Sequence, residues 1–321
     1  MTFAQLSVIC FVAILGPLLA FPRGWHLPVV LGELLAGIAL GRTGTHYLHS
    51  ENATFSFLSD IGFALVMFVA GTHVPVRDPA IRPALKSGIL RAVVVAIVAG
   101  ALGTAIAYAT GVHHAPLYAV LIASSSAALI LPIVDSLGLK GDGVVGLLPQ
   151  IAIADTLCIV ALPLAVDPKH ALRAAGGAAA VIGAAAVVFL ALRAAEKSGL
   201  RKKVHDVSEE RRFAAELRVQ LVILFALAAL AKSTHVSIML AGFAFGLGVA
   251  AIGEPRRLSR QLFALTEGFL GPLFFVWLGS ELNLRELGAH PKMIGLGKPN
   301  SQAPMVTATP RPKLITVTIA T

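Results

Sequence analysis

Charge and cysteine are both scarce in this chain of 321 residues. Charged residues make up 13% of it, about half the share of a typical soluble domain. The two cysteines, Cys10 and Cys158, lie in apolar runs and form no C-x-x-C pair, so we interpret them as small buried side chains. The sequence also lacks any constellation of nucleophile and base or of metal ligands, so we do not expect an enzyme.

Long apolar runs fill the sequence instead. Hydrophobic residues make up 56% of the chain, and many runs reach the length of about 20 residues that crosses a bilayer. We therefore predict an all-α polytopic membrane protein, surrounded by membrane lipid. About ten spans are expected, near residues 4–20, 27–42, 56–74, 88–110, 115–137, 143–166, 171–192, 214–231, 235–252 and 262–283.

Basic residues are distributed unevenly between the predicted loops. The odd-numbered loops hold 17 lysines and arginines, whereas the even-numbered loops hold 4. Because basic loops face the cytoplasm, we expect the N-terminus outside a cell membrane, as in a bacterial inner membrane. The longest charged loop, 193–218, is then a cytoplasmic connector. These loops account for the net charge of +9, and no nucleic-acid-binding motif accompanies it.

One acid lies deep inside an apolar span. Asp155 is flanked by long apolar runs within the predicted span 143–166. A charged side chain at the bilayer centre costs about 2.5–3.5 kcal/mol on insertion scales, so such groups usually handle protons or ions in a polar cavity. We expect Asp155 to bind both. The candidate further oxygen ligands are Ser124, Ser125, Ser126 and Thr156.

Those three serines have two possible roles. Together with Pro132, they favour a helix that is interrupted where irregular backbone lines a cavity. Serine hydroxyls in a helix also commonly bond back to their own backbone or bridge neighbouring helices. The sequence leaves both roles open.

The two halves of the chain resemble each other. LAGIALG (35–41) is similar to LAGFAFG (240–246), and LVMFVAGTHVPVRD (65–78) matches LFFVWLGSELNLRE (273–286) in outline. The spans that hold the two copies enter the membrane from opposite sides, which is typical of an inverted repeat. The glycines of the first motif are interpreted as helix-packing residues. They are Gly37, Gly41, Gly242 and Gly246.

The second copy is shorter than the first, so we expect the second repeat to be incomplete. A single transmembrane domain is expected over 1–287. Its predicted parts are a first repeat at about 1–167, the connector 193–218 and a partial second repeat at about 235–287. The segment 297–321 contains four prolines and no apolar span, so it is predicted to be a disordered tail outside that domain.

Four motifs in order resemble one transporter family. They are GELLAGIALG (32–41), DIGFALVMFVAG (60–71), SSSAALILPIVDSLGL (124–139) and PLFFVWLGSELNL (272–284). Together they are similar to the monovalent cation:proton antiporters, the bacterial sodium/proton and potassium/proton exchangers. The tail 297–321 has no counterpart in this resemblance.

The resemblance implies an inverted-repeat antiporter fold of about thirteen helices, with an interrupted helix and a dimerisation part that would form a homodimer. It also implies that Asp155 is the ion- and proton-binding aspartate, and that no cofactor takes part beyond the transported H⁺ and Na⁺ or K⁺. Many members carry Asp, Asn or Gln before that aspartate, where this chain has Ala154.

Three functions therefore remain open. The first is secondary exchange of Na⁺ or K⁺ for protons through Asp155. The second is a truncated, transport-inactive fragment of such an antiporter. The third is an inverted-repeat transporter of an organic anion, for which the midplane basic residue is missing. Glu33 and Glu267 lie near the cytoplasmic ends of their spans and are interpreted as interfacial or helix-packing groups, and Asp60 as a solvated residue near a span start.

Overall fold

The computed structural model describes residues 1–21, 29–72, 76–77, 81–111, 114–124, 171–199, 215–253 and 256–285, with single residues and pairs between 150 and 165. Every element over these described residues is a helix. The chain divides into two units, Met1–Leu284 and Arg285–Thr321, and the second is described only at Arg285.

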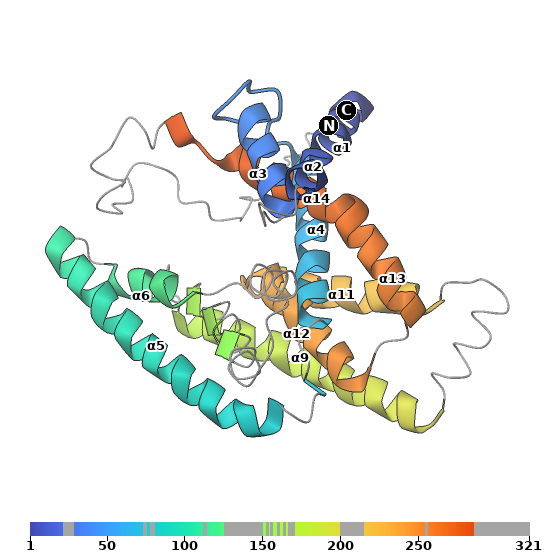
Figure 1. The fold of residues 1–321 in the computed structure, drawn as a ribbon. Coiled ribbons are helices and arrows are strands. Elements are labelled where there is room, and N and C mark those ends of the chain that lie inside the picture. The colour runs from blue at the N-terminus through green and yellow to red at the C-terminus, as the bar shows by residue number, and fades with distance from the viewer. Residues whose placement is uncertain are drawn as a thin grey trace, which may run out of the picture. The chain divides into compact units, whose positions relative to one another are not determined.

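Outside residues 150–165, the described part of the chain contains twelve helical segments, most of which are labelled in Figure 1. In the first half these are α1 (Phe3–Ala13), α2 (Leu15–Ala20), α3 (Val29–Leu40), α4 (Ala53–Thr72), α5 (Ile81–Thr110) and α6 (Ala115–Ala123). In the second half they are α9 (Ala171–Lys197), α11 (Ala215–Ser233), α12 (Ile238–Ile252), α13 (Arg256–Leu265), the π-helix η2 (Thr266–Leu270) and α14 (Gly271–Glu281).

Four of these segments are long and apolar enough to cross a membrane: Ala53–Thr72, Ser87–Ala109, Ala175–Lys197 and Gln261–Glu281. Shorter apolar helices cover Phe3–Leu19, Val29–Leu40 and Ile238–Ile252. The prediction of an all-α polytopic membrane protein is confirmed. The predicted spans 115–137 and 143–166 lie largely outside the described residues.

Two predicted spans differ in detail from the helices. The span expected near 4–20 is two helices that meet at Ile14. Pro17 has no N–H to donate to the carbonyl of Ala13, which explains a helix break at this point. The span expected near 262–283 agrees with Gln261–Glu281, but the helix itself begins earlier, at Arg256, with a basic turn before the apolar part.

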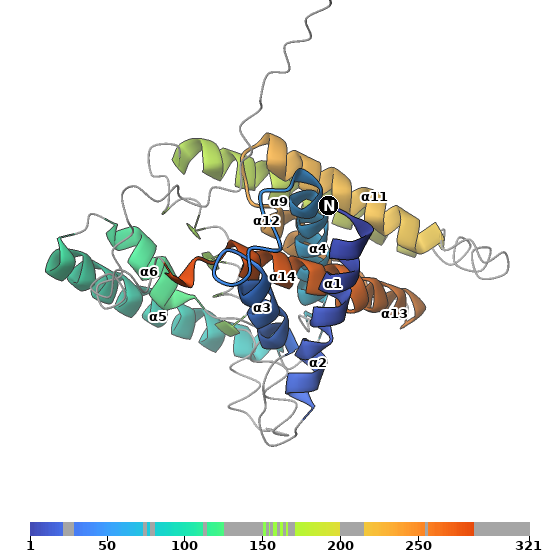
Figure 2. The same cartoon turned by 90° about the horizontal axis from the view of Figure 1, so that it is seen from above.

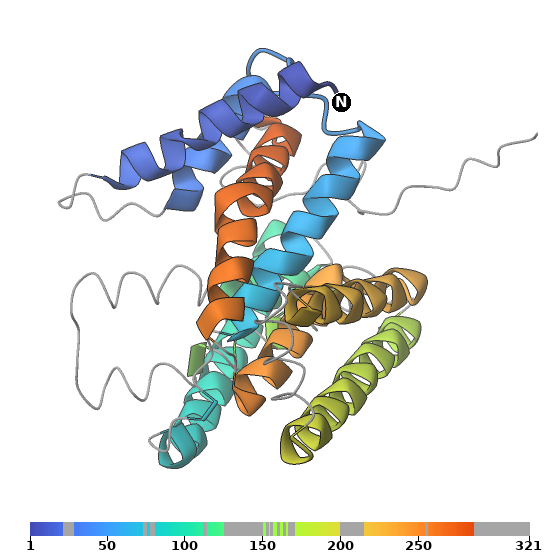
Figure 3. The same ribbon diagram turned by 90° about the vertical axis from the view of Figure 1, so that its right-hand side faces the viewer.

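The core of the described scaffold lies around α4. This helix packs against α12 and α14, and α14 in turn packs against α3. Figure 3 shows α4 and α14 running side by side, and Figure 2 shows α1 beside α3 and α14. The side chains of Leu65, Phe68 and Phe245 are almost completely buried here, and the two phenylalanine rings lie 4.9 Å apart. α5 and α6 form a separate helical pair that packs together.

Candidate functional site

The helix α6 ends within the predicted apolar span, directly before the three serines. It stops at Ala123, and Ser124 has an extended backbone with φ −64° and ψ 137°. The Ser124 hydroxyl donates a hydrogen bond of 2.8 Å to the carbonyl oxygen of Leu121 in the last helical turn. The hydroxyl proton of Ser124 therefore caps the end of α6, while its oxygen keeps lone pairs that can accept from or coordinate another group.

The segment around Asp155 is described only in part. Asp155, Thr156, Ser125 and Ser126 lie outside the described residues, whereas Ala154, Leu157 and Cys158 lie within them. The Cys158 thiol contacts the carbonyl oxygen of Val120 in α6 at 3.8 Å. This contact joins a residue three positions after Asp155 to a residue four positions before Ser124.

The four motif glycines lie where helices of the two halves touch. A Cβ atom on Gly37 would lie 2.9 Å from the Cα of Gly279 and would clash with the carbonyl oxygen of Val276. A Cβ atom on Gly246 would lie 2.9 Å from the Cα of Gly71 and would clash with the carbonyl oxygen of Phe68. Neither position admits even a methyl group. Gly41 approaches Ser280 and Gly242 approaches Ala64 in the same way.

These contacts pair the repeated motifs crosswise. α3 carries the first copy of the LAG motif, LAGIALG (35–41), and packs on α14, which carries the second copy of the other repeated motif, LFFVWLGSELNLRE (273–286). α12 carries the second copy of the LAG motif and packs on α4, which carries the first copy of that other motif. Each contact therefore joins the N-terminal half of the chain to the C-terminal half, with the backbones close enough for carbonyl and Cα atoms to touch.

Hydrogen bonds join the end of one crossing, and a charged side chain lies against a glycine at the end of the other. Thr43 lies just after α3, and its hydroxyl donates to the carbonyl oxygen of Leu282 at 2.6 Å and accepts from the backbone N–H of Leu284 at 2.9 Å. At the end of α12, Gly253 has φ +102°, and the Arg77 guanidinium lies where its Cβ would be. In each crossing, a side chain that follows the N-terminal helix (Thr43 after α3, Arg77 after α4) lies against the end of the helix from the C-terminal half.

An ion pair that the sequence did not indicate joins α4 to α11. The ammonium group of Lys232 lies 2.6 Å from a carboxylate oxygen of Asp60, and the two side chains are 46% and 25% exposed. Asp60 is partly exposed near the start of α4, as interpreted from the sequence, and it is also paired with Lys232. The two partners are 172 residues apart, so no local pattern pointed to the pair.

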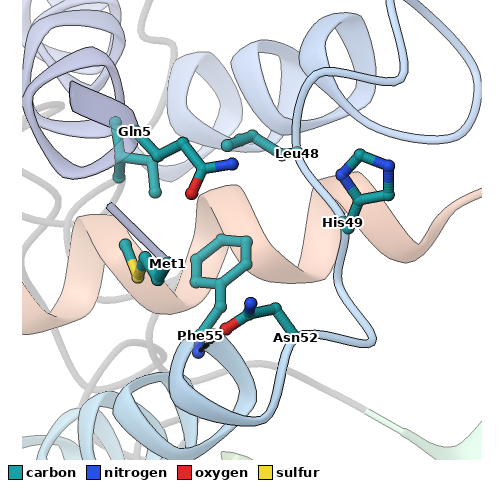
Figure 4. Close-up of a pocket in the computed structure, with 7 residues that line it drawn as sticks. Met1, Gln5, Leu48, His49, Asn52 and Phe55 are labelled. Atoms are coloured by element: carbon teal, nitrogen blue, oxygen red, sulfur yellow. Dashed lines mark hydrogen bonds between the residues drawn. The ribbon is translucent and has the colours of Figure 1, made fainter. Parts of the chain in front are cut away.

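A small cavity lies between the first residues, the loop after α3 and the start of α4 (Figure 4). It has a volume of about 100 Å³ and is lined by Met1, Gln5, Ile9, Leu48, His49, Asn52 and Phe55. Two of its polar side chains already accept hydrogen bonds from the protein backbone. Gln5 Oε1 accepts from the backbone N–H of Thr2, and Asn52 Oδ1 accepts from those of Thr54 and Phe55. None of the seven lining residues is acidic, so this cavity does not resemble a cation site.

The fold defines a multi-pass helical membrane protein whose two halves pack crosswise. Residues 10–297 match the model of the family described as sodium/hydrogen exchanger, transmembrane. The chain belongs to that family, which is a family of transporters.

Two curated relatives carry names from the same family. The chain is 24% identical over 271 residues to the "Probable Na(+)/H(+) antiporter 3" of Methanocaldococcus jannaschii, and the match covers 82% of this chain and 68% of that protein. It is 23% identical over 296 residues to YjbQ of Bacillus subtilis, which is named as a candidate Na(+)/H(+) antiporter. This second match covers 88% of the chain but only 48% of the relative.

Proposed function

We propose that this chain exchanges Na⁺ or K⁺ for protons across the cell membrane through Asp155. The family supports cation:proton antiport in general. The observation that supports this segment is the end of α6 at Ser124, inside an apolar span. One turn earlier in α6, the carbonyl oxygen of Val120 contacts the thiol of Cys158, which lies three residues after Asp155. An interrupted helix beside an intramembrane acid is the arrangement in which irregular backbone lines an ion-binding cavity.

The proposed exchange follows from competition for one carboxylate. An anionic Asp155 attracts either a proton or a cation, and binding of one displaces the other. The hydroxyl oxygen of Ser124, and those proposed for Ser125, Ser126 and Thr156, are hard oxygen ligands suited to Na⁺ or K⁺. If the carboxylate faces the two sides of the membrane in turn, each cycle moves protons one way and cations the other.

The crosswise helix pairs are proposed as the fixed frame of this cycle. Their backbones touch at Gly37–Gly279 and Gly71–Gly246, so they have no room to slide or rotate without separating. We further propose that the N-terminus lies outside, that lipid covers the exposed apolar helix faces, that two copies form a homodimer and that no cofactor takes part.

The test is the collapse of a pH gradient in proteoliposomes, followed with a dye. Na⁺, K⁺ and Li⁺ are added in turn to vesicles that hold the wild-type chain, Asp155→Asn or Asp155→Glu. Glu51→Gln is the matched control, since Glu51 is an acid with a side chain 81% exposed. The proposal expects cation-dependent collapse that is lost in Asp155→Asn and retained in Glu51→Gln.

The other outcomes are equally informative. Collapse that does not depend on the added cation, but does depend on an organic anion, would replace this proposal by anion transport. Absence of collapse by well-inserted wild-type protein would refute transport by this chain alone.

A further inference from the structure

A buried acid on α3 takes no part in the proposed exchange site. Glu33 is 4% exposed and lies one helical turn before Gly37, at the crossing of α3 with α14. Within the part of the chain that the structure describes, it has neither a hydrogen bond nor an ion pair. Removing an ionised carboxylate from water without such a partner is strongly unfavourable.

The described helices that pack against α3 carry no positively charged side chain. Its side chain packs along α2, where a Cβ atom on Gly16 would lie 3.0 Å from the Glu33 Cγ. The described elements packed against α3 are α1, α2 and α14. α2 has no ionisable side chain, α1 has only Cys10, and α14 has only Glu281, at its far end.

A second acid lies on the same side of the crossing. Gly37 meets Val276 and Gly41 meets Ser280, so α3 and α14 run parallel and their N-terminal ends lie together. Glu267 is on the π-helical turn that leads into the N-terminal end of α14. The Glu267 side chain is exposed, whereas Glu33 is buried.

The geometry points to Glu33 as a second proton-binding carboxyl group, loaded from the cytoplasmic side through Glu267. A bound proton removes the charge from Glu33, and with it the cost of burial. Unlike a metal cation, a proton bound to Glu33 needs neither a cavity nor further oxygen ligands. In the transfer, the Glu267 carboxylate takes a proton from the cytoplasm, passes it to the Glu33 carboxylate and becomes ionised again.

The π-helical turn gives this assignment independent support. Such turns are rare and often mark functional positions, because they shift side chains out of the regular α-helical register. Here the turn begins at Thr266, which is fully buried and whose hydroxyl has no hydrogen-bond partner among the described residues. The residue that follows it is Glu267, so the irregular turn sets the direction of this exposed acid at the N-terminal end of α14.

The test is infrared difference spectroscopy of the full chain in lipid nanodiscs, which detects the C=O stretch of protonated carboxyl groups. It is made in an Asp155→Asn background, so Asp155 contributes nothing and the result does not depend on whether the chain transports. We expect a protonated-carboxyl band at neutral pH that moves in D₂O, is lost with Glu33→Gln and is retained with Glu51→Gln. A band that survives Glu33→Gln unchanged, or no band in the background chain, overturns the assignment.

A second comparison tests the role of Glu267. Glu267→Gln should keep the band but slow its shift on transfer to D₂O by about tenfold or more, since a positioned acid–base group has been removed. An unchanged rate refutes loading through Glu267. Should Glu33→Gln fail to fold, Glu33→Asp keeps a carboxyl group on a shorter side chain. A displaced band then supports Glu33 as its source, and an undisplaced band overturns it.

Discussion

Replacing Gly246 by alanine places a methyl group between α12 and α4. The new Cβ atom would lie 2.9 Å from the Cα of Gly71, with the carbonyl oxygen of Phe68 still closer. Carbon atoms pack best at about 3.5–4.0 Å, so the two helices must move apart by roughly half an ångström or more. Overpacking of this kind costs about 1–3 kcal/mol, which is about 5- to 150-fold in the unfolding equilibrium.

The matched control is Gly183→Ala in α9, where no atom lies within 4 Å of the added methyl group. Both variants gain the same helix propensity of alanine over glycine, about 1 kcal/mol. The difference between them therefore isolates the steric cost of the crossing. The assay is equilibrium unfolding in detergent micelles by SDS titration, with helicity as the readout.

The same reasoning applies to the other helix pair, α3 and α14. Gly37→Ala should destabilise the chain by a similar amount, because the new Cβ atom would lie at the same 2.9 Å from the Cα of Gly279. If Gly246→Ala and Gly37→Ala are both as stable as Gly183→Ala, the close approach of the two helix pairs is refuted.

Three further predictions concern single contacts of the scaffold. Asp60→Lys should lower stability by about 1 kcal/mol or less, as expected for a partly exposed pair, and the double exchange Asp60→Lys with Lys232→Asp should restore it in the same SDS titration; no recovery would contradict the pairing. Gly253→Ala should lower the thermal unfolding temperature, because φ +102° disfavours alanine and its Cβ would meet Arg77; an unchanged temperature would refute this. Thr266→Val should be neutral or stabilising, because it removes a buried hydroxyl that has no partner among the described residues, and a marked loss of stability would show that the hydroxyl is bonded.

The sequence was sufficient to predict which segments are helices within the described part of the chain. Apolar runs of bilayer length and small residues at four-residue spacing are local signals, and α3, α4 and α12 lie close to the predicted spans. The break at Ile14 was missed although Pro17 is a local signal for it. The π-turn at Thr266 was missed because neither its composition nor its spacing differs from that of an ordinary apolar helix.

Long-range partners could not be predicted in the same way. The motif glycines were recognised as small residues in apolar spans, but nothing in the sequence said that α3 would pack on α14 and α4 on α12. Likewise, Asp60 and Lys232 are each unremarkable at a span end, and only the packing of α4 near α11 brings them to 2.6 Å. Glu33 was interpreted as an interfacial or helix-packing group; at 4% exposed, with its side chain against Gly16 of α2, it agrees with the helix-packing interpretation.

The central claim is that a proton and a cation compete for one carboxylate, Asp155. The most direct test measures proton release in weakly buffered detergent solution when Na⁺ or K⁺ is added to the purified chain. Binding of a cation to a protonated ligand must release its proton, so we predict release of at most about one proton per chain from this site. The release should be absent in Asp155→Asn and retained in Glu51→Gln. Release of the same size in Asp155→Asn would contradict the account, and so would absence of release from the wild-type chain.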